Sequence, residues 1–318
     1  MATHDATGSS LLSTLPSEPD PNPFAGVDFN ELERSLRRPR TLINVLLSGL
    51  VTCMTLVALI PLFSVIWMLL WRGGRKLSLA LFTQLPPAPL EQGGGFGNAV
   101  LGTLIIVLLA ALISMPLGIL SAVFMAQAPE RSRLASAVRF SAKVLTGFPS
   151  ILAGVFAYGA VVLVMGGYSA IAGAVAVSIL MLPTIMLTAE DAIRMVPAKM
   201  KEAAIGMGAT RTQTVLMVLL PTAFPGILTG IMLAVARAAG ETAPLLFTAL
   251  FSNYWPVSGH HLNLMQPTAS LAVLIYNFAG MPFQNQVEMA WAAALVMVLM
   301  VLITNLVGQS LSRQQVQS

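Results

Sequence analysis

The feature that most constrains this chain is its succession of apolar runs, each about as long as a membrane is thick. A hydrocarbon core of about 30 Å is crossed by a helix of about 20 residues. Runs of that length predict six spans, at 42–71, 99–126, 144–165, 170–188, 220–250 and 289–307. Regular alternation of apolar and polar residues, which a membrane barrel requires, is absent. The sequence therefore predicts an all-α, polytopic membrane protein with six transmembrane helices.

The composition excludes a soluble domain. Only 9% of the residues are charged while 56% are hydrophobic, so a soluble surface could not be covered. The net charge of +4 comes from bases beside the spans, which indicates membrane orientation and no nucleic-acid partner. The one cysteine, Cys53, lies inside the first run, so it is expected to pack as a small hydrophobic residue.

The distribution of Lys and Arg predicts the orientation. With the N-terminus inside, thirteen of them fall on the cytoplasmic side and three, Arg72, Arg75 and Lys76, fall outside. These three outer cations are an exception to the rule. The four tryptophans all fall near the predicted outer interface, where an indole ring is favoured. Both termini are therefore expected in the cytoplasm. The thirteen inner bases are Arg34, Arg37, Arg38, Arg40, Arg131, Arg133, Arg139, Lys143, Arg194, Lys199, Lys201, Arg211 and Arg313.

The chain divides into a tail, a first span and a core. Residues 1–40, rich in Pro, Ser and acidic residues, are expected to form a disordered cytoplasmic tail and not a signal peptide. The basic end of this tail, 31–40, is read as a topology anchor, with a short surface helix as the alternative. The first transmembrane helix is placed at 41–72, the core at 97–308 and a cytoplasmic C-terminal tail at 309–318. An outer loop at 252–286 contains a segment, 268–278, that suits a surface helix or a re-entrant helix.

The cytoplasmic loop 190–216 has the local signals of a short helix, a tight turn and a second helix. Pro197 suits the first turn of the first helix, and Gly208 can end that helix in a left-handed cap. Thr210 and Gln213 have the spacing of a capping box for the second helix. The first helix carries one apolar stripe, made of Met200, Ala203, Ala204 and Met207.

Two interpretations of this loop remain open from physical chemistry. Ala203 and Ala204 permit close approach of another protein, and Glu202, on the opposite face, offers a charge for a basic partner. The alternative is an interfacial helix that lies on its own membrane.

The fifth run carries two charges, Arg237 and Glu241, on one helix face at i, i+4 spacing. A run of this length is expected to break near Gly240 and Pro244. Arg237 lies about 24 Å beyond Pro221, in the outer half of the membrane. A charge at such depth faces protein or water, and a guanidinium can bind two oxygens of a phosphate. The alternative is a structural ion pair that fixes the helix.

The remaining polar residues of note do not indicate a catalytic or metal site. Glu288, at the outer edge of the last span, is interpreted as an interfacial residue. His260 and His261 are adjacent in an outer loop and converge poorly on one ion, so no metal site is expected. Nothing in the sequence resembles a set of nucleophile, base and acid, and no catalytic residue is expected.

Two motifs resemble a known family. The sequence Glu202-Ala203-Ala204, followed by Gly208 and the ending Val218-Leu219-Leu220-Pro221, resembles the cytoplasmic loop of type I, MetI-like ATP-binding-cassette importer permeases. Val218 departs from that pattern, which usually has Ile. The stretches "ARAAGETAPLLFTA" at 236–249 and "GFPSILAG" at 147–154 resemble PstA-type phosphate importer permeases. The resemblance covers about 97–308.

The resemblance implies a permease subunit of a phosphate importer in the bacterial inner membrane. The partners it implies are membrane lipid, a PstC-type permease, two copies of a PstB-type ATPase and a PstS-type phosphate-binding protein. ATPase coupling falls to Glu202, Ala203, Ala204 and Gly208, and the substrate path to Arg237 and Glu241. The chain has no Gly-rich loop of the type that binds ATP, so ATP binds the partner subunits and no cofactor is expected. The alternatives are a permease for sulfate or molybdate, and an autonomous secondary transporter that uses Arg237, Glu241 and Glu288.

Overall fold

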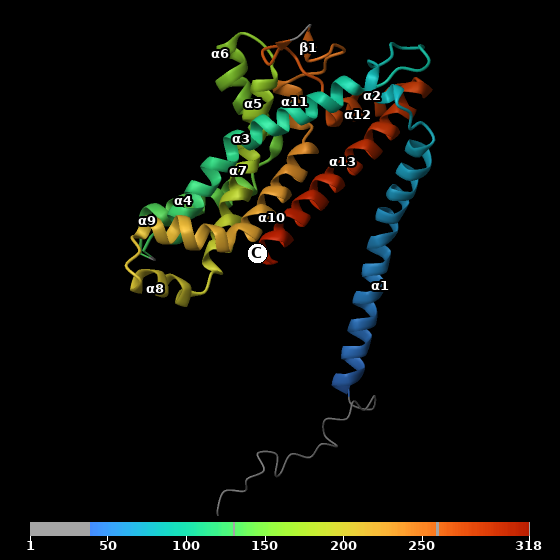
Figure 1. The fold of residues 1–318 in the computed structure, drawn as a ribbon. Helices are drawn as coiled ribbons and strands as arrows, with labels where there is room; N and C mark the ends of the chain where they lie inside the picture. The colour runs from blue at the N-terminus through green and yellow to red at the C-terminus, as the bar shows by residue number, and fades with distance from the viewer. Residues whose placement is uncertain (1–38, 130, 259–260, 318) are drawn as a thin grey trace, which may run out of the picture. The chain divides into compact units, whose positions relative to one another are not determined.

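The computed structural model describes residues 39–129, 131–258 and 261–317, and the chain divides into two units between Phe63 and Ser64. The predictions for a disordered tail and for a basic helix at 31–40 fall almost wholly outside the described residues. The first unit contains most of one long helix, and the second contains the remaining elements (Figure 1).

The described chain is almost entirely helical, and it includes three π-helical turns, labelled η. In order, the elements are α1 (Pro39–Met68), η3 (Leu69–Gly73), α2 (Ala80–Thr83), α3 (Gly97–Gln127), α4 (Arg133–Thr146), α5 (Ser150–Ala157), η4 (Tyr158–Val162), α6 (Leu163–Met165), α7 (Ala170–Arg194), α8 (Ala198–Gly206), α9 (Arg211–Gln213), η5 (Thr214–Leu219), α10 (Leu220–Ala239), α11 (Ala243–Thr248), β1 (Val257–Ser258), β2 (His261–Leu262), α12 (Leu271–Ala279) and α13 (Gln284–Gln317). The two short strands form one antiparallel pair, with Val257 opposite Leu262.

Five helices in the described chain are long and apolar enough to cross a membrane, and a bent pair can supply a sixth crossing. The five are Arg40–Gly73, Gly97–Gln127, Ala170–Arg194, Arg211–Ala239 and Gln284–Ser310. They match the predicted first, second, fourth, fifth and sixth spans, and the predicted all-α membrane fold is confirmed.

The predicted third span, 144–165, is not one straight helix. Arg133–Thr146 and Ser150–Met165 meet at an angle of 106°. Pro149 lies at the break and lacks a backbone N–H donor, and its ring disfavours helical geometry at Phe148. The apolar run therefore combines the last turn of the amphipathic helix α4 with the shorter segment α5 to α6.

Two predicted helix ends also differ from the structure. The fourth span was expected to end at residue 188, but α7 continues to Arg194, so the loop that follows begins later than the predicted residue 190. The last span was expected to end at 307 with a tail after it, but α13 continues to Gln317. Hydropathy falls where charged and polar residues begin, although the helix itself does not end there.

The predicted break in the fifth run is confirmed. The helix α10 ends at Ala239 and α11 starts at Ala243, with Pro244 in the first turn of α11. Pro221, expected either to interrupt a helix or to start a span, is the second residue of α10 and does not interrupt the helix. The turn before it, η5, is π-helical and keeps the helix continuous from Arg211.

The main core of the second unit lies between α3, α7 and α10 (Figure 1). Small residues on α3 and α7, such as Ala110 and Ala174, let the helix backbones approach closely, which is how membrane helices gain packing contacts. Larger residues such as Val177 and Ile185 fill the remaining space and are fully buried. Truncating Ile185 to Ala would open a cavity and cost about 2–5 kcal/mol.

The segment 268–278 forms an interior helix, α12, and not a surface helix. Leu271, Val273 and Leu274 are fully buried, and α12 packs against α13 and α3. The backbone N–H of Leu271 donates to the Thr103 hydroxyl at 2.9 Å, and Ser270 caps the helix. The outer loop therefore folds back into the protein before α13 begins.

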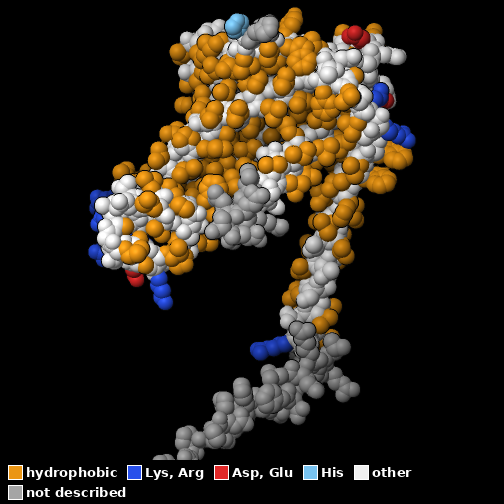
Figure 2. Space-filling view, in the orientation of Figure 1, with side chains coloured by type: hydrophobic (Ala, Val, Ile, Leu, Met, Phe, Trp, Pro, Cys, Tyr) orange, Lys and Arg blue, Asp and Glu red, His pale blue; other side chains and the backbone are white. Residues whose placement is uncertain are grey.

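The surface of the second unit is largely apolar between two polar ends. Figure 2 shows hydrophobic side chains over its middle, with Lys and Arg gathered near α8 and α9 at one end. In the first unit, Cys53 is exposed on α1.

Candidate functional site

The loop between α7 and α10 has the predicted helix, turn and helix. Pro197 lies at the N-cap of α8, one residue before the first turn in which it was expected. Gly208 has a φ of 87°, the left-handed conformation predicted for it. The capping box is present: the Gln213 backbone N–H donates to the Thr210 hydroxyl at 3.3 Å, and the Thr210 backbone N–H donates to Gln213 Oε1 at 2.8 Å.

Most of the predicted docking surface on α8 is unoccupied by the described chain. Ala204 is buried, while Glu202 and Ala203 are exposed. Met200 and Met207 are 41% and 84% exposed, so the predicted apolar stripe is not a packed face of this chain. Because apolar side chains left open in this way mark interaction sites, the surface of α8 is available to another molecule.

Arg237 and Glu241 form the predicted pair. Arg237 lies in the last turn of α10, and its Nε lies 3.3 Å from Glu241 Oε1. The Arg237 side chain is 44% exposed and that of Glu241 13% exposed, so the pair leaves the guanidinium accessible. The free carbonyl groups at the end of α10 also favour a cation there. The arrangement provides a restrained guanidinium that can still contact an anion.

A buried carboxylate, Glu190, was missed from the sequence. It lies near the end of α7 with a side chain only 3% exposed, and it contacts two arginines. Arg139 Nε, from α4, donates to both carboxylate oxygens at 3.0 and 3.1 Å, and Arg194 Nε donates at 2.9 Å. Both guanidinium groups also reach the Met125 carbonyl at the end of α3. This cluster, Arg139, Glu190, Arg194 and the Met125 carbonyl, joins three helices directly before the loop.

Two signals could have located part of this cluster. Glu190 and Arg194 have i, i+4 spacing on a helix. An acidic residue at the end of an apolar run also requires a partner. The contact with Arg139 depends on the packing of α4 against α7, which no local pattern reveals.

The three cations that contradicted the charge rule each have a partner. Arg72 lies 5.5 Å from the ring centre of Trp291, and Arg75 lies 4.3 Å from that of Trp71. Lys76 Nζ lies 2.7 Å from Glu288 Oε2, and Gln284 also donates to Glu288. Glu288 therefore takes part in an ion pair at the start of α13. Among the described residues, no cluster suited to a metal ion is present, and His260 lies outside them.

Comparison with a family model defines the class of protein. The model for "Binding-protein-dependent transport system inner membrane component" matches residues 114–317, which include the loop, the Arg237–Glu241 pair and the Glu190 cluster. The chain belongs to this family of membrane components of binding-protein-dependent transporters. It is therefore a non-catalytic, multi-pass component of the inner membrane.

Curated relatives place the chain within that family. It is 39% identical over 254 residues to the "Phosphate transport system permease protein PstA" of Yersinia pestis, which covers 79% of this chain and 84% of the relative. It is 38% identical over 265 residues to the protein of the same name in Haemophilus influenzae, covering 83% and 91%. A probable protein of that name in Methanocaldococcus jannaschii is 36% identical over 255 residues, covering 80% and 88%.

Solved structures of lower identity support the fold. The structure of a bacterial alginate ABC transporter in complex with its periplasmic protein matches with a TM-score of 0.60 and 17% identity, covering 89% of this chain and 98% of that one. The MetNI methionine ABC transporter in an inward-facing conformation matches with a TM-score of 0.54 and 21% identity, covering 69% and 93%. These similarities show that the chain has the type I importer permease fold.

Proposed function

We propose that this chain is the transmembrane permease subunit of an ATP-driven phosphate importer. The observation that carries the proposal is its 39% identity to a phosphate transport system permease over 84% of that relative's length. The accessible guanidinium of Arg237 supports it, because a planar fork suits two phosphate oxygens. In this function the chain provides half of the translocation path, and a homologous permease of the PstC type provides the other half.

The orientation proposed for the chain places α8 in the cytoplasm and the loop after α11 outside. A PstB-type ATPase binds the exposed surface of α8, with Glu202 and Ala203 at the contact and Gly208 holding the turn. Two copies of the ATPase serve the two permeases. A PstS-type protein delivers phosphate to the outer face. The chain converts movement of α8 into opening of the path.

In the proposed path, Arg237 contacts phosphate during passage. A permease has to release its substrate, and strong binding at this point would slow transport. Glu241, 3.3 Å from the Arg237 Nε, competes with phosphate for the guanidinium and limits the strength of binding. The alternative role, a structural pair that fixes the end of α10, makes a different prediction for the neutral variants.

The test is uptake of radiolabelled phosphate by the complete importer in proteoliposomes with internal ATP. The parent importer should take up phosphate, and excess sulfate or molybdate should not compete. Uptake that continues without ATPase subunits in a proton gradient would identify a secondary transporter instead. Uptake of sulfate or molybdate in place of phosphate would identify a different oxyanion permease.

Variants of the pair separate the two roles. Arg237→Gln should lose most uptake without loss of assembled complex, and Arg237→Lys should be intermediate because it keeps the charge and loses the fork. Glu241→Gln should change the rate more than the yield of complex. If the double neutral variant recovers both yield and parental uptake, the pair is structural and the path proposal is wrong.

A further inference from the structure

A hollow of about 650 Å³ lies between α10 and α13, on the exposed side of the second unit. Its lining includes the polar side chains of Thr229, Asn305 and Gln309. In the proposed orientation, α10 runs outward and α13 runs inward, so these residues lie in the cytoplasmic half of the spans. We refer to this hollow as the α10–α13 groove.

The floor of the groove is a close contact between the two helices. A Cβ atom on Gly308 would overlap the Met232 Cγ and Sδ atoms, so the absence of a side chain at residue 308 lets Met232 of α10 pack against α13. The groove opens on the exposed side of this contact. Its depth therefore follows from helix packing and does not require movement of a loop.

The polar side chains of the groove are unusual for a membrane segment. Side-chain amides turned toward lipid are costly, and such residues normally face protein or water. Among the described residues, the structure gives neither the Asn305 nor the Gln309 side chain a hydrogen-bond partner, and the Thr229 hydroxyl donates only to the Pro225 carbonyl at 2.9 Å. The two amides are therefore available to another hydrogen-bonding group.

The groove continues the exposed face of α10 that carries Arg237. Thr229, Leu233 and Arg237 are spaced four residues apart on one side of the helix, and all three are exposed. At 1.5 Å per residue, Thr229 lies about 12 Å from Arg237 along the axis. A solute that leaves Arg237 toward the cytoplasm along this face reaches the groove.

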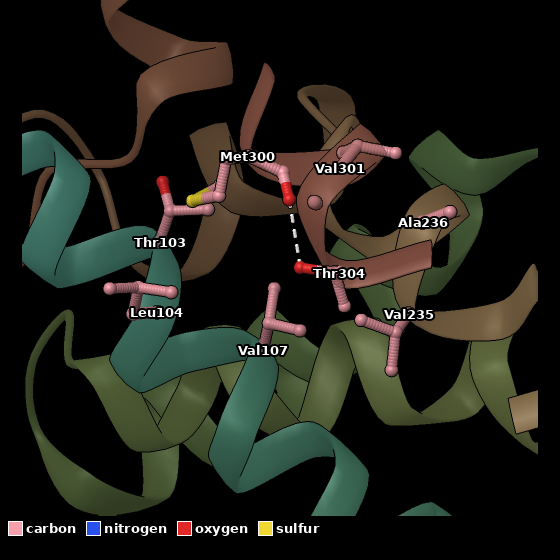
Figure 3. Close-up of a pocket in the computed structure, with 9 residues that line it drawn as sticks. Thr103, Leu104, Val107, Val235, Ala236, Met300, Val301 and Thr304 are labelled. Atoms are coloured by element: carbon pink, nitrogen blue, oxygen red, sulfur yellow. Dashed lines mark hydrogen bonds between the residues drawn. The ribbon is translucent and has the colours of Figure 1, made fainter. Parts of the chain in front are cut away.

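A small interior hollow beside the groove does not suit passage of an anion. Figure 3 shows a small hollow where Thr103 and Val107 of α3, Ala236 of α10, and Met300 and Thr304 of α13 meet. Its volume of about 40 Å³ is too small for a hydrated anion, and its lining is mainly apolar. The Thr304 hydroxyl donates to the Met300 carbonyl at 2.8 Å, so it is occupied within α13. Of these two hollows, the α10–α13 groove is the one that has both room for an anion and polar side chains.

We propose that the α10–α13 groove is the cytoplasmic half of the phosphate path, closed on its open side by the partner permease. This inference rests on the proposed function. The side-chain amides of Asn305 and Gln309 donate hydrogen bonds that replace part of the hydration shell of the anion. Because both amides are uncharged, they bind the anion weakly, and it passes from Arg237 to the cytoplasm without a second strong site.

The first test compares uptake by variants of the groove in the complete importer. Asn305→Leu should lower phosphate uptake about threefold to tenfold, the range expected for loss of one hydrogen bond in a transport step. Asn305→Gln keeps an amide and should retain most of the uptake. The matched control is Leu306→Ala, because Leu306 is 55% exposed and does not line the groove. If Asn305→Leu lowers the yield of complex, phosphate uptake by Gln309→Leu tests the loss of an amide hydrogen bond in the groove instead.

The second test probes the environment of the groove with an anionic methanethiosulfonate reagent, in a Cys53→Ala background. A thiol in apolar surroundings has a raised pKa, and each unit removes about tenfold of its thiolate. Asn305→Cys should therefore react about tenfold or more faster than Leu306→Cys. Phosphate should slow the reaction of Asn305→Cys with the anionic reagent.

The results distinguish this inference from the proposed function. If the parent importer takes up phosphate, while Asn305→Leu and Gln309→Leu transport at the parental rate and Asn305→Cys reacts no faster than Leu306→Cys, the groove is not the path. If the parent importer with all its partners takes up no phosphate, the proposed function itself fails. Lower uptake with phosphate-protected labelling of Asn305→Cys supports the inference.

Discussion

The Glu190 cluster permits a prediction whose magnitude follows from the exposure of its members. Glu190→Gln keeps the shape of the side chain and removes its charge, which leaves Arg139 and Arg194 without the carboxylate that both contact. Removing one partner of a buried ion pair costs about 3–5 kcal/mol. The side chains of Arg139 and Arg194 are 28% and 49% exposed, so water compensates part of the loss. We expect a cost near the lower limit, about 3 kcal/mol.

The two arginines should differ in their effect. Arg139 contacts both oxygens of Glu190, whereas Arg194 contacts one oxygen from a half-exposed position. Arg139→Gln should therefore cost about 2–3 kcal/mol, and Arg194→Gln about 1 kcal/mol or less. The double variant Glu190→Gln/Arg139→Gln should lose less free energy of unfolding than the sum of the single variants. In each single variant one charge of the pair loses its partner, whereas the double variant removes both charges.

The assay is thermal unfolding of the purified importer, together with phosphate transported per ATP hydrolysed. Glu190→Gln should lower the Tm by roughly 5–10 °C for a cost of about 3 kcal/mol. It should also lower the transport ratio, because α7 leads directly into α8. Two results would refute the reasoning: an unchanged Tm for Glu190→Gln, or an Arg194→Gln that is as destabilising as Arg139→Gln.

Three further predictions concern the loop and the orientation. Gly208→Val forces a β-branched residue to a φ of 87°, so it should abolish ATPase stimulation by the binding protein, whereas Gly208→Asn should keep part of it and Gly206→Ala all of it. Stimulation at the parental level in Gly208→Val would show that the turn does not matter. Glu202→Lys should prevent copurification of the ATPase, and normal copurification together with normal uptake would exclude a charged contact at that residue. In a cysteine-free background, Asn253→Cys should react with an impermeant reagent in intact cells and Lys199→Cys only after lysis; the reverse pattern would invert the topology.

Local signals predicted the loop well. The capping box of Thr210 and Gln213 and the left-handed Gly208 depend on residues three or fewer positions apart, and the structure contains both. The break after Ala239 followed from the length of the run and from Pro244. Such features form from short-range contacts, so one sequence is enough to find them.

Non-local contacts were not predictable in the same way. The end of α7 was placed too early because Glu190 is charged, and the arginine that binds most of its carboxylate is on α4. The bend at Pro149 was hidden by the apolar residues on both sides of it. No local sequence pattern marks Asn305 as functional, because it lines a groove only through the packing of α13 against α10.

The contacts of the outer cations Arg72 and Lys76 also bear on the order in which parts of the protein fold during synthesis. Arg72 and Lys76 are synthesised early, but their partners Trp291 and Glu288 belong to the last helix. Until that helix leaves the ribosome, Arg72 and Lys76 lack the ring and the carboxylate that they contact in the folded protein, so the end of the first span docks late. A chain that stops before Gln284 would lack both partners. The last helix thus completes the contacts at this end of the first span, and truncated chains would leave Arg72 and Lys76 without these partners while Arg75 keeps Trp71.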